Sequence, residues 1–179
     1  MSSTALIVTL QMDEASAARF TELRRQHFPP ERNWLEAHIT LFHALPVASL
    51  HTVLQDAAAV AGRTDAFRLR VDRVHFLGAG VAYAMSSPEA LAVRATLAEA
   101  WLPLLGRQDL AWRGPLHVTV QNKVQPPVAR RLQAELEQGF QPHDVGAVGL
   151  QVWHYEGGPW RAAAAFSFAG RDTVIDRRA

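Results

Sequence analysis

The stretch AHITLFHAL, residues 37–45, predicts a β-strand, because β-branched and large apolar residues alternate in it with polar ones. Side chains alternate across a strand, so His38 and Thr40 project from one face while Ile39 and Leu41 project from the other. The two polar side chains lie about 6 to 7 Å apart along the strand, which is close enough for both to touch one phosphate group. The apolar pair is expected to pack beneath helices.

A second tetrapeptide, HVTV at residues 117–120, repeats this pattern with His117 and Thr119 on one face of its strand. His117 lies 79 positions after His38, and the same offset relates other turns, histidines and apolar positions without a gap. The further pairs are Leu69 with Val148, Val71 with Leu150, His75 with His154, Phe76 with Tyr155, and Gly78 with Gly157. The period is too long and the copies too few for a solenoid. We therefore interpret residues 1–179 as a single domain made of two pseudo-symmetric lobes that face each other.

The remaining elements follow a similar order in both halves, as a mixture of α and β. Strands are predicted at residues 4–11, 66–77, 81–87, 145–156 and 160–168, and helices from Asp13 to about His27, at 47–62, at 87–106 and at about 127–138. Pro88 in the first turn and Gly62 at a helix end support these boundaries. The tail at 170–179 is predicted to be frayed.

Composition limits the classes of protein to consider. The 179 residues suffice to bury a core, so no oligomer is required and we expect a monomer. A formal charge of +1, with Lys123 the only lysine, argues against a long RNA footprint, although a local arginine patch can still grip an RNA end. No cysteine is present. The N-terminal sequence has neither a secretory signal nor a membrane span, so we expect a cytoplasmic protein that does not bind membranes.

Two lobes related by a pseudo-two-fold axis can place their His-Thr faces on opposite sides of a cleft. Imidazole titrates near neutral pH, so one histidine can take a proton from an attacking water while the other donates one to the leaving oxygen. Threonine hydroxyls can hold non-bridging phosphate oxygens. This chemistry needs no metal and no cofactor, and the sequence contains neither a helical His-x-x-x-His zinc motif nor a phosphate-binding G-x-x-x-x-G-K loop.

Paired His-x-Thr strands within a repeat resemble the 2H phosphoesterase superfamily, which includes bacterial 2'-5' RNA ligases and cyclic phosphodiesterases. The segment LRRQHFPPERNWLEAHITLFHALP (23–46) is similar to the form found in generic members of the 2'-5' RNA ligase family. The resemblance implies an α+β fold of two antiparallel-rich sheets flanked by helices around a central cleft. It also implies that His38 and His117 are the catalytic acid-base pair and that Thr40 and Thr119 bind phosphate.

Arginines and tryptophans in the loops before the two motif strands are candidate substrate-binding residues: Arg32, Trp34, Trp112 and Arg113. The alternative is that the tryptophans pack against the lobes and the arginines are solvated. Tyr83 and Arg161 are weaker candidates. Among the other histidines, His75 and His154 are near turns, where a structural role competes with cleft lining. His43 is expected on the face opposite His38, by alternation, and His27 ends a helix.

The resemblance does not name a substrate. Activities in the family include hydrolysis of 2',3'-cyclic phosphates, opening of cyclic ADP-ribose phosphates, cleavage of 2'-5' oligonucleotides and joining of RNA ends. We expect a metal-independent hydrolase that acts on the 2',3'-cyclic phosphate of a nucleotide or an RNA end. One alternative is a module that binds RNA ends or nucleotides with little catalysis. Another is a structural repeat whose histidines matter only for folding.

Overall fold

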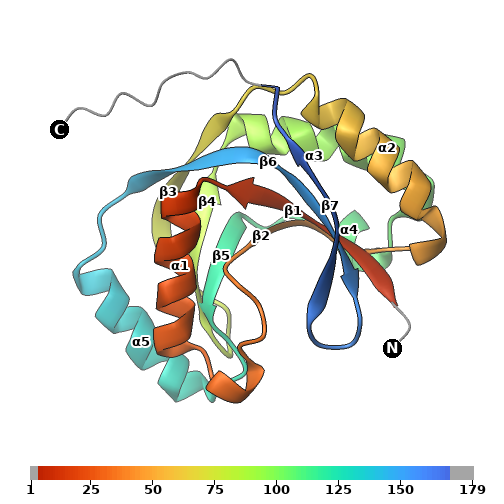
Figure 1. Ribbon diagram of the computed structural model, residues 1–179. Helices are drawn as coiled ribbons and strands as arrows, with labels where there is room; N and C mark the ends of the chain where they lie inside the picture. The colour runs from red at the N-terminus through yellow and green to blue at the C-terminus, as the bar shows by residue number, and fades with distance from the viewer. Residues whose placement is uncertain (1–3, 170–179) are drawn as a thin grey trace.

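The computed structural model describes residues 4–169, and the tail at 170–179 lies outside them. Figure 1 shows a curved antiparallel sheet with helices packed around it. Its strands are β1 (Ala5–Met12), β2 (Ile39–Leu45), β3 (Phe67–Phe76), β4 (Val81–Ser86), β5 (Leu116–Gln121), β6 (His143–Tyr155) and β7 (Trp160–Ser167). The α-helices are α1 (Glu14–His27), α2 (Leu50–Ala61), α3 (Pro88–Ala100), α4 (Arg107–Leu110) and α5 (Pro126–Gln138). Three 3₁₀ turns, η1 (Pro30–Arg32), η2 (Val47–Ser49) and η3 (Leu102–Leu104), complete the elements.

The strands form one sheet in the order β1-β2-β5-β4-β3-β6-β7, and every pairing is antiparallel. Because β1 also pairs with β6, six of these strands close into a ring, and β7 extends it beside β6. The predicted α+β class, with an antiparallel sheet flanked by helices, is confirmed. The strands expected in two sheets instead join into one continuous hydrogen-bonded ladder. The division into two repeated lobes stays a prediction.

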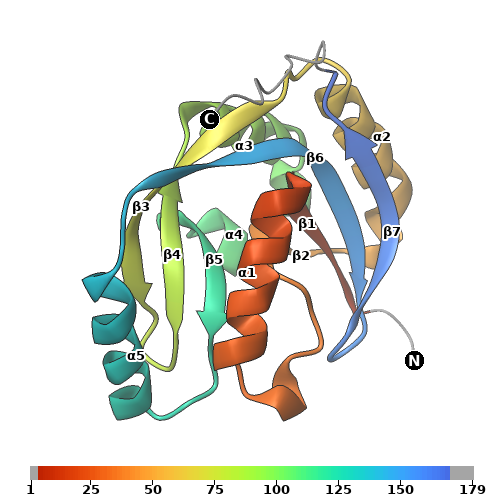
Figure 2. The same cartoon turned by 60° about the vertical axis from the view of Figure 1, so that its left-hand side comes forward.

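One face of the sheet carries the core. In Figures 1 and 2, α1 and α5 lie near one end of the curved sheet, by β3, β4 and β5, and α2 and α3 lie near the other end. Their apolar side chains join those of the strands in a single cluster, with Phe20, Phe42 and Trp101 among the largest buried members. Phe20 of α1 contacts Tyr83 of β4, with 5.5 Å between ring centroids. The apolar faces of the motif strands lie in this cluster, as predicted, with Ile39 and Val118 fully buried.

Helix boundaries follow from their caps. Asp13 caps α1 by accepting a hydrogen bond from the backbone N–H of Ser16 (2.9 Å) and another from that of Gly146 (2.7 Å), which ties α1 to β6. The helix predicted over 87–106 is shorter than expected, because α3 ends at Ala100. Pro103 cannot donate a backbone hydrogen bond and disfavours helical geometry before it, so the chain continues as η3.

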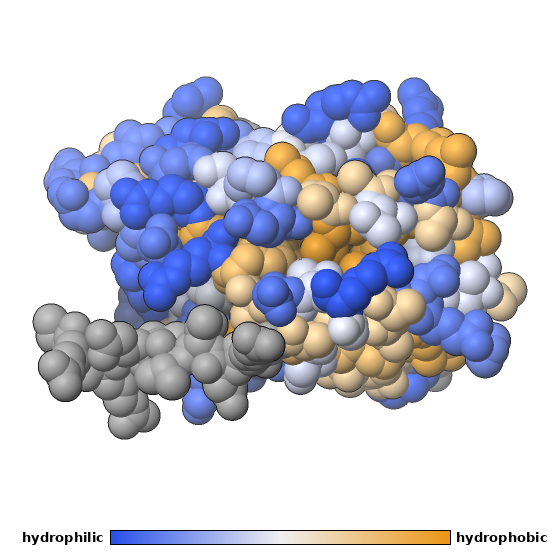
Figure 3. All heavy atoms as spheres, turned by 90° about the horizontal axis from the view of Figure 1, so that it is seen from above, coloured by the Kyte–Doolittle hydropathy of each residue, from blue (hydrophilic) through white to orange (hydrophobic). Residues whose placement is uncertain are grey.

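Figure 3 shows the molecule from above, with apolar side chains in the middle of this face and toward its right-hand edge, and hydrophilic ones over much of the rest. Among residues 4–169, large exposed apolar side chains include Leu91 of α3 and Leu102 of η3. Within residues 4–169, no helix combines the length and the apolarity needed to cross a membrane.

Candidate functional site

The sheet register brings the two His-x-Thr motifs together. Strands β2 and β5 are neighbours, and Ile39 pairs with Val118, the residues that directly follow the two histidines. In an antiparallel pair with this register, His38 faces Thr119 and Thr40 faces His117 across the two strands. All four side chains are partly exposed, whereas Ile39 and Val118 are fully buried. The four polar groups therefore share the face of the sheet that points away from the core.

Both motif histidines are oriented by a backbone carbonyl two residues earlier. Nδ1 of His38 lies 2.8 Å from the carbonyl oxygen of Glu36, and Nδ1 of His117 lies 3.2 Å from that of Pro115. A carbonyl oxygen only accepts hydrogen bonds, so Nδ1 carries the proton in both rings. In the neutral form, Nε2 of each ring is then a free base, and it is available for a ligand.

Burial keeps both imidazoles neutral. Removal from water lowers the pKa of His38 to about 4, against the opposing effect of the Glu36 carbonyl, and the charges of Arg24 and His117 lower it further. Burial likewise lowers the pKa of His117 below 6.5, despite its hydrogen bond to Pro115. Desolvation penalises the charged imidazolium in both cases. In the ligand-free protein near neutral pH, His38 and His117 are therefore bases without their second proton.

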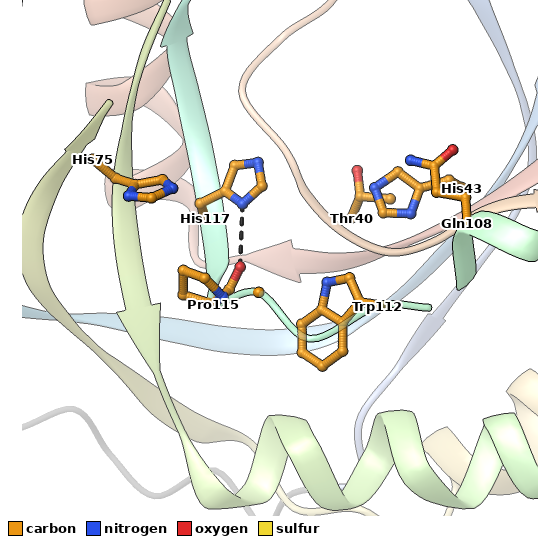
Figure 4. Close-up of a pocket in the computed structure, with 8 residues that line it drawn as sticks. Thr40, His43, His75, Gln108, Trp112, Pro115 and His117 are labelled. Atoms are coloured by element: carbon orange, nitrogen blue, oxygen red, sulfur yellow. Dashed lines mark hydrogen bonds between the residues drawn. The ribbon is translucent and has the colours of Figure 1, made fainter. Parts of the chain in front are cut away.

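A cavity of about 250 Å³ opens on the His117 side of the motif strands, and we call it the histidine pocket. In Figure 4, Thr40, His43 and Gln108 lie on one side of it and His117 and His75 on the other, with Trp112 below. Its lining residues are Thr40, His43, His75, Gln108, Trp112, Gly114, Pro115 and His117. The rings of His75 and His117 are 6.4 Å apart. The pocket is thus lined by three imidazoles, a hydroxyl and an amide.

A second cavity, of about 270 Å³, opens on the His38 side, and we call it the tryptophan pocket. It is lined by Trp34, Leu35, Glu36, Ala37, His38, Gln151, Trp153 and Trp160. The ring of Trp160 lies 4.5 Å from that of His38, and the indole N–H of Trp153 donates to the hydroxyl of Thr9 at 2.9 Å. Aromatic surface beside a polar group is suited to stacking on a planar ring.

The prediction for His43 is wrong. Strict alternation places His43 on the face opposite His38, but His43 lines the histidine pocket together with Thr40. The cause is a β-bulge: Thr9 pairs with Thr40 but Val8 pairs with Phe42, so Leu41 is an extra residue in β2. The bulge inverts the alternation that follows it. Leu41 and Phe42 are both fully buried as a result.

Two buried arginines donate hydrogen bonds to backbone carbonyl oxygens in and near the motif strands. Arg24 of α1 donates to the carbonyl oxygens of Leu35 (3.1 Å) and Thr119 (2.9 Å), which joins the segment before β2 to strand β5. Arg94 of α3 donates to the carbonyl oxygens of Leu41 (3.1 Å) and Asp109 (3.0 Å). Burial lowers the pKa of Arg24 to about 10, so its guanidinium stays charged at neutral pH. Both arginines fix backbone next to a motif residue.

The four predicted flanking residues have different surroundings. Trp112 lines the histidine pocket, and Trp34, although 59% exposed, lines the tryptophan pocket. Arg32 is exposed in η1, and Arg113 donates to the carbonyl oxygens of Leu110 and Trp112. Neither arginine lines either pocket. Substrate contact by these four residues stays a prediction.

The weaker candidate residues occupy different environments in the structure. Tyr83 is buried against Phe20 in the core, and Arg161 is exposed and paired with Glu156 at 2.9 Å. His75 lines the histidine pocket, whereas its repeat counterpart His154 is buried. Within the described part of the chain, no group of three or more histidines and carboxylates is placed to hold a metal ion.

Comparison with known proteins agrees with this architecture. The sequence matches the family model "2'-5' RNA ligase superfamily" over residues 12–159. A search of curated proteins with the sequence finds no match. Among solved structures, TT0787 of Thermus thermophilus is similar, with a TM-score of 0.65, 15% identity, and coverage of 93% of this chain and 99% of that one. E. coli LigT complexed with 3'-AMP is similar, with a TM-score of 0.60, 16% identity and the same coverage.

A structure described as a phosphoesterase is similar too, with a TM-score of 0.61, 14% identity, and coverage of 93% of this chain and 99% of that one. At such identities the structural likenesses establish the fold, while the family model matches most of the chain. The predicted resemblance to this family is thereby confirmed: the chain belongs to the 2'-5' RNA ligase superfamily.

Proposed function

We propose that this protein is a metal-independent phosphodiesterase that hydrolyses the 2',3'-cyclic phosphate of a nucleotide or an RNA end. Membership of the family supports phosphoester chemistry in general. The observation that carries the specific proposal is the matched pair of imidazoles. Each donates Nδ1–H to the carbonyl two residues before it and keeps Nε2 for a ligand, beside a threonine of the partner motif.

The proposed reaction uses the two histidines in opposite roles. His38 takes a proton from water through Nε2 as the water oxygen bonds to phosphorus. The bond from phosphorus to one ribose oxygen breaks, and Nε2–H of His117 gives its proton to that oxygen. The hydroxyls of Thr40 and Thr119 donate to the non-bridging oxygens and stabilise their growing charge. Proton exchange with solvent restores both histidines.

The electrostatics of the site support this assignment of roles. The pKa of His38, lowered to about 4 by burial, gives a base that is unprotonated over most of the pH range. His117 must be protonated to act as the acid. Burial lowers the pKa of His117 as well, so its imidazole is neutral in the ligand-free protein at neutral pH. A bound phosphate anion favours the charged imidazolium and raises that pKa, so the substrate itself helps to protonate the acid.

The first test is turnover of a 2',3'-cyclic nucleotide by the purified protein in excess chelator. We expect chelator-resistant hydrolysis with one phosphomonoester formed per substrate, measured by ³¹P NMR or by chromatography. Activity that disappears with chelator and returns with a divalent cation would contradict the metal-independent mechanism. Tight nucleotide binding without any turnover would instead favour a binding module.

The pH dependence provides a separate prediction. The kcat/KM profile reports the ligand-free protein, so its acid limb should lie near the pKa of His38, about 4, and its alkaline limb below 6.5, where His117 loses its proton. The optimum of kcat/KM should therefore be acidic. The kcat profile should lie at higher pH, because bound phosphate raises the pKa of both imidazoles.

Initial rates across about pH 3 to 9, at low and at saturating substrate, separate the two profiles. The variant His51→Ala changes an exposed histidine of α2 and should leave both profiles unaltered. A kcat/KM optimum above pH 7 would show that His38 and His117 are not the titrating pair.

A further inference from the structure

The histidine pocket contains an imidazole that the proposed reaction does not use. Nδ1 of His43 lies 2.9 Å from Oδ1 of Asp109, whose side chain is fully buried while that of His43 is 30% exposed. The same carboxylate accepts the backbone N–H of His43 at 3.0 and 3.1 Å and that of Ala44 at 3.2 Å. Asp109, in the short helix α4, therefore orients the side chain of His43 in β2.

The charge on Asp109 fixes which nitrogen of His43 faces the pocket. Burial alone would raise the pKa of Asp109, but hydrogen bonds from the ring and backbone of His43 and from Ala44 lower it overall. An ionised carboxylate only accepts hydrogen bonds, so Nδ1 of His43 carries a proton. In neutral His43, Nε2 is therefore an acceptor. The ring of His43 is oriented by Asp109, and it lines the same pocket as Thr40 and His117.

The other lining groups indicate what this acceptor binds. Gln108 adds an amide, and Trp112 adds an aromatic surface that is held by the guanidinium of Arg94, 4.1 Å from its ring centroid. No lysine or arginine lines the pocket, so it lacks the charge that a second phosphate requires. Nε2 of His43 and the amide of Gln108 can form hydrogen bonds with sugar hydroxyls, and the Trp112 ring can pack against the sugar ring.

We propose that the histidine pocket is a sugar-binding subsite, in which Nε2 of His43 accepts a hydrogen bond from a hydroxyl of the nucleotide. The subsite rests on the proposed function, since it assumes that the phosphate lies between His38 and His117. Asp109 acts as a positioning residue by holding the ring and its tautomer. His43 contributes to recognition of the nucleoside and makes no contact with the phosphorus.

Two variants of His43 separate this role from a structural one. His43→Asn places an amide nitrogen near Nδ1, so the hydrogen bond to Asp109 is kept while the group at Nε2 is lost. His43→Gln is longer by one methylene and carries its amide toward the position of Nε2. Calorimetry should show that Asn weakens binding of a nucleoside 2'-monophosphate about three- to tenfold, whereas Gln retains most of the affinity.

Inorganic phosphate and hydroxyl-deleted ligands supply the controls. Binding of phosphate alone should be equal in wild type and both variants, because phosphate contacts His38 and His117. The 3'-deoxy or the 5'-deoxy nucleotide, whichever lacks the recognised hydroxyl, should bind wild type and His43→Asn equally. Thermal unfolding of each variant checks that the fold is intact.

The outcomes distinguish this inference from the function on which it rests. If His43→Asn weakens phosphate and nucleotide by the same factor, the residue contacts the phosphate and the sugar subsite is wrong. If neither affinity changes while wild type is active, the subsite is also wrong and the proposed function stands. If wild type neither binds nor hydrolyses nucleotides, the proposed function fails and the subsite fails with it.

Discussion

His38→Ala and His117→Ala should each reduce hydrolysis of a 2',3'-cyclic nucleotide by about 10²- to 10⁴-fold, the usual contribution of a positioned proton carrier. Both histidines are half-buried and oriented through Nδ1, so alanine removes the Nε2 atom that the proposed reaction uses. Steady-state kcat and KM with one substrate at several pH values give the measurement. The loss should appear mainly in kcat, because proton transfer belongs to the transition state.

The double variant tests whether the two histidines act as one unit. If they do, combining the substitutions should reduce the rate by far less than the product of the single effects. His51→Ala serves as a matched histidine control on an exposed helix face. Full activity in both single variants would falsify the acid-base assignment. In that case the family fold would serve some other chemistry or binding alone.

Asp109→Ala is expected to destabilise the protein by about 3 kcal/mol, which would lower Tm by about 6 to 12 °C in a chain of this size. The buried carboxylate accepts hydrogen bonds from the backbone N–H groups of His43 and Ala44 and from the His43 ring. Alanine leaves these donors without a partner in a buried place, and unmade buried hydrogen bonds are costly. Chemical and thermal unfolding measure the change.

The pH dependence of this effect has a fixed sign. Hydrogen bonds hold the folded-state pKa of Asp109 below 3.8, although burial opposes them, so the unfolded chain takes up a proton first as the pH falls. The stability contributed by the carboxylate is therefore fully present above about pH 5 and is lost as the pH falls through the folded-state pKa. Wild type and Asp109→Ala should converge in acid.

Glu22→Gln is the control, because it removes an exposed carboxylate that pairs with Arg25 on the surface of α1. Surface ion pairs contribute little, so its unfolding midpoint should not move. Equal midpoints for wild type and Asp109→Ala at neutral pH would mean that solvent replaces the carboxylate. In that case Asp109 would not be the residue that positions the His43 ring.

The two motifs were predictable because strand alternation is a local property. His38 directly precedes β2 and Thr40 is the second residue of the strand, with no bulge between them, and His117 and Thr119 have the same spacing within β5. Asp13 at the start of α1 and Gly62 at the end of α2 have local signals of the same kind. Capping and alternation act over a few residues, so one sequence contains them.

The residues that were not predicted depend on tertiary structure. His43 reached the pocket through a bulge, and alternation carries no signal for an extra residue such as Leu41. Asp109 contacts His43 across 66 positions, and Trp160 contacts His38 from the far end of the chain. Arg24 and Arg94 lie in helices α1 and α3, and both are buried and donate to strand carbonyls far away in the sequence. Only the folded sheet determines these neighbours.

The closed ring of strands has a consequence for how the chain is made. Strand β1, among the first residues synthesised, pairs along its length with β6, which is completed only at Tyr155, and β3 also waits for β6. Until β6 leaves the ribosome, β1 and β3, both in the first half of the chain, present unpaired edges that can aggregate. Such distant pairing also slows folding after release. Production of the protein should therefore be sensitive to growth temperature and to chaperone supply, even where the finished fold is stable.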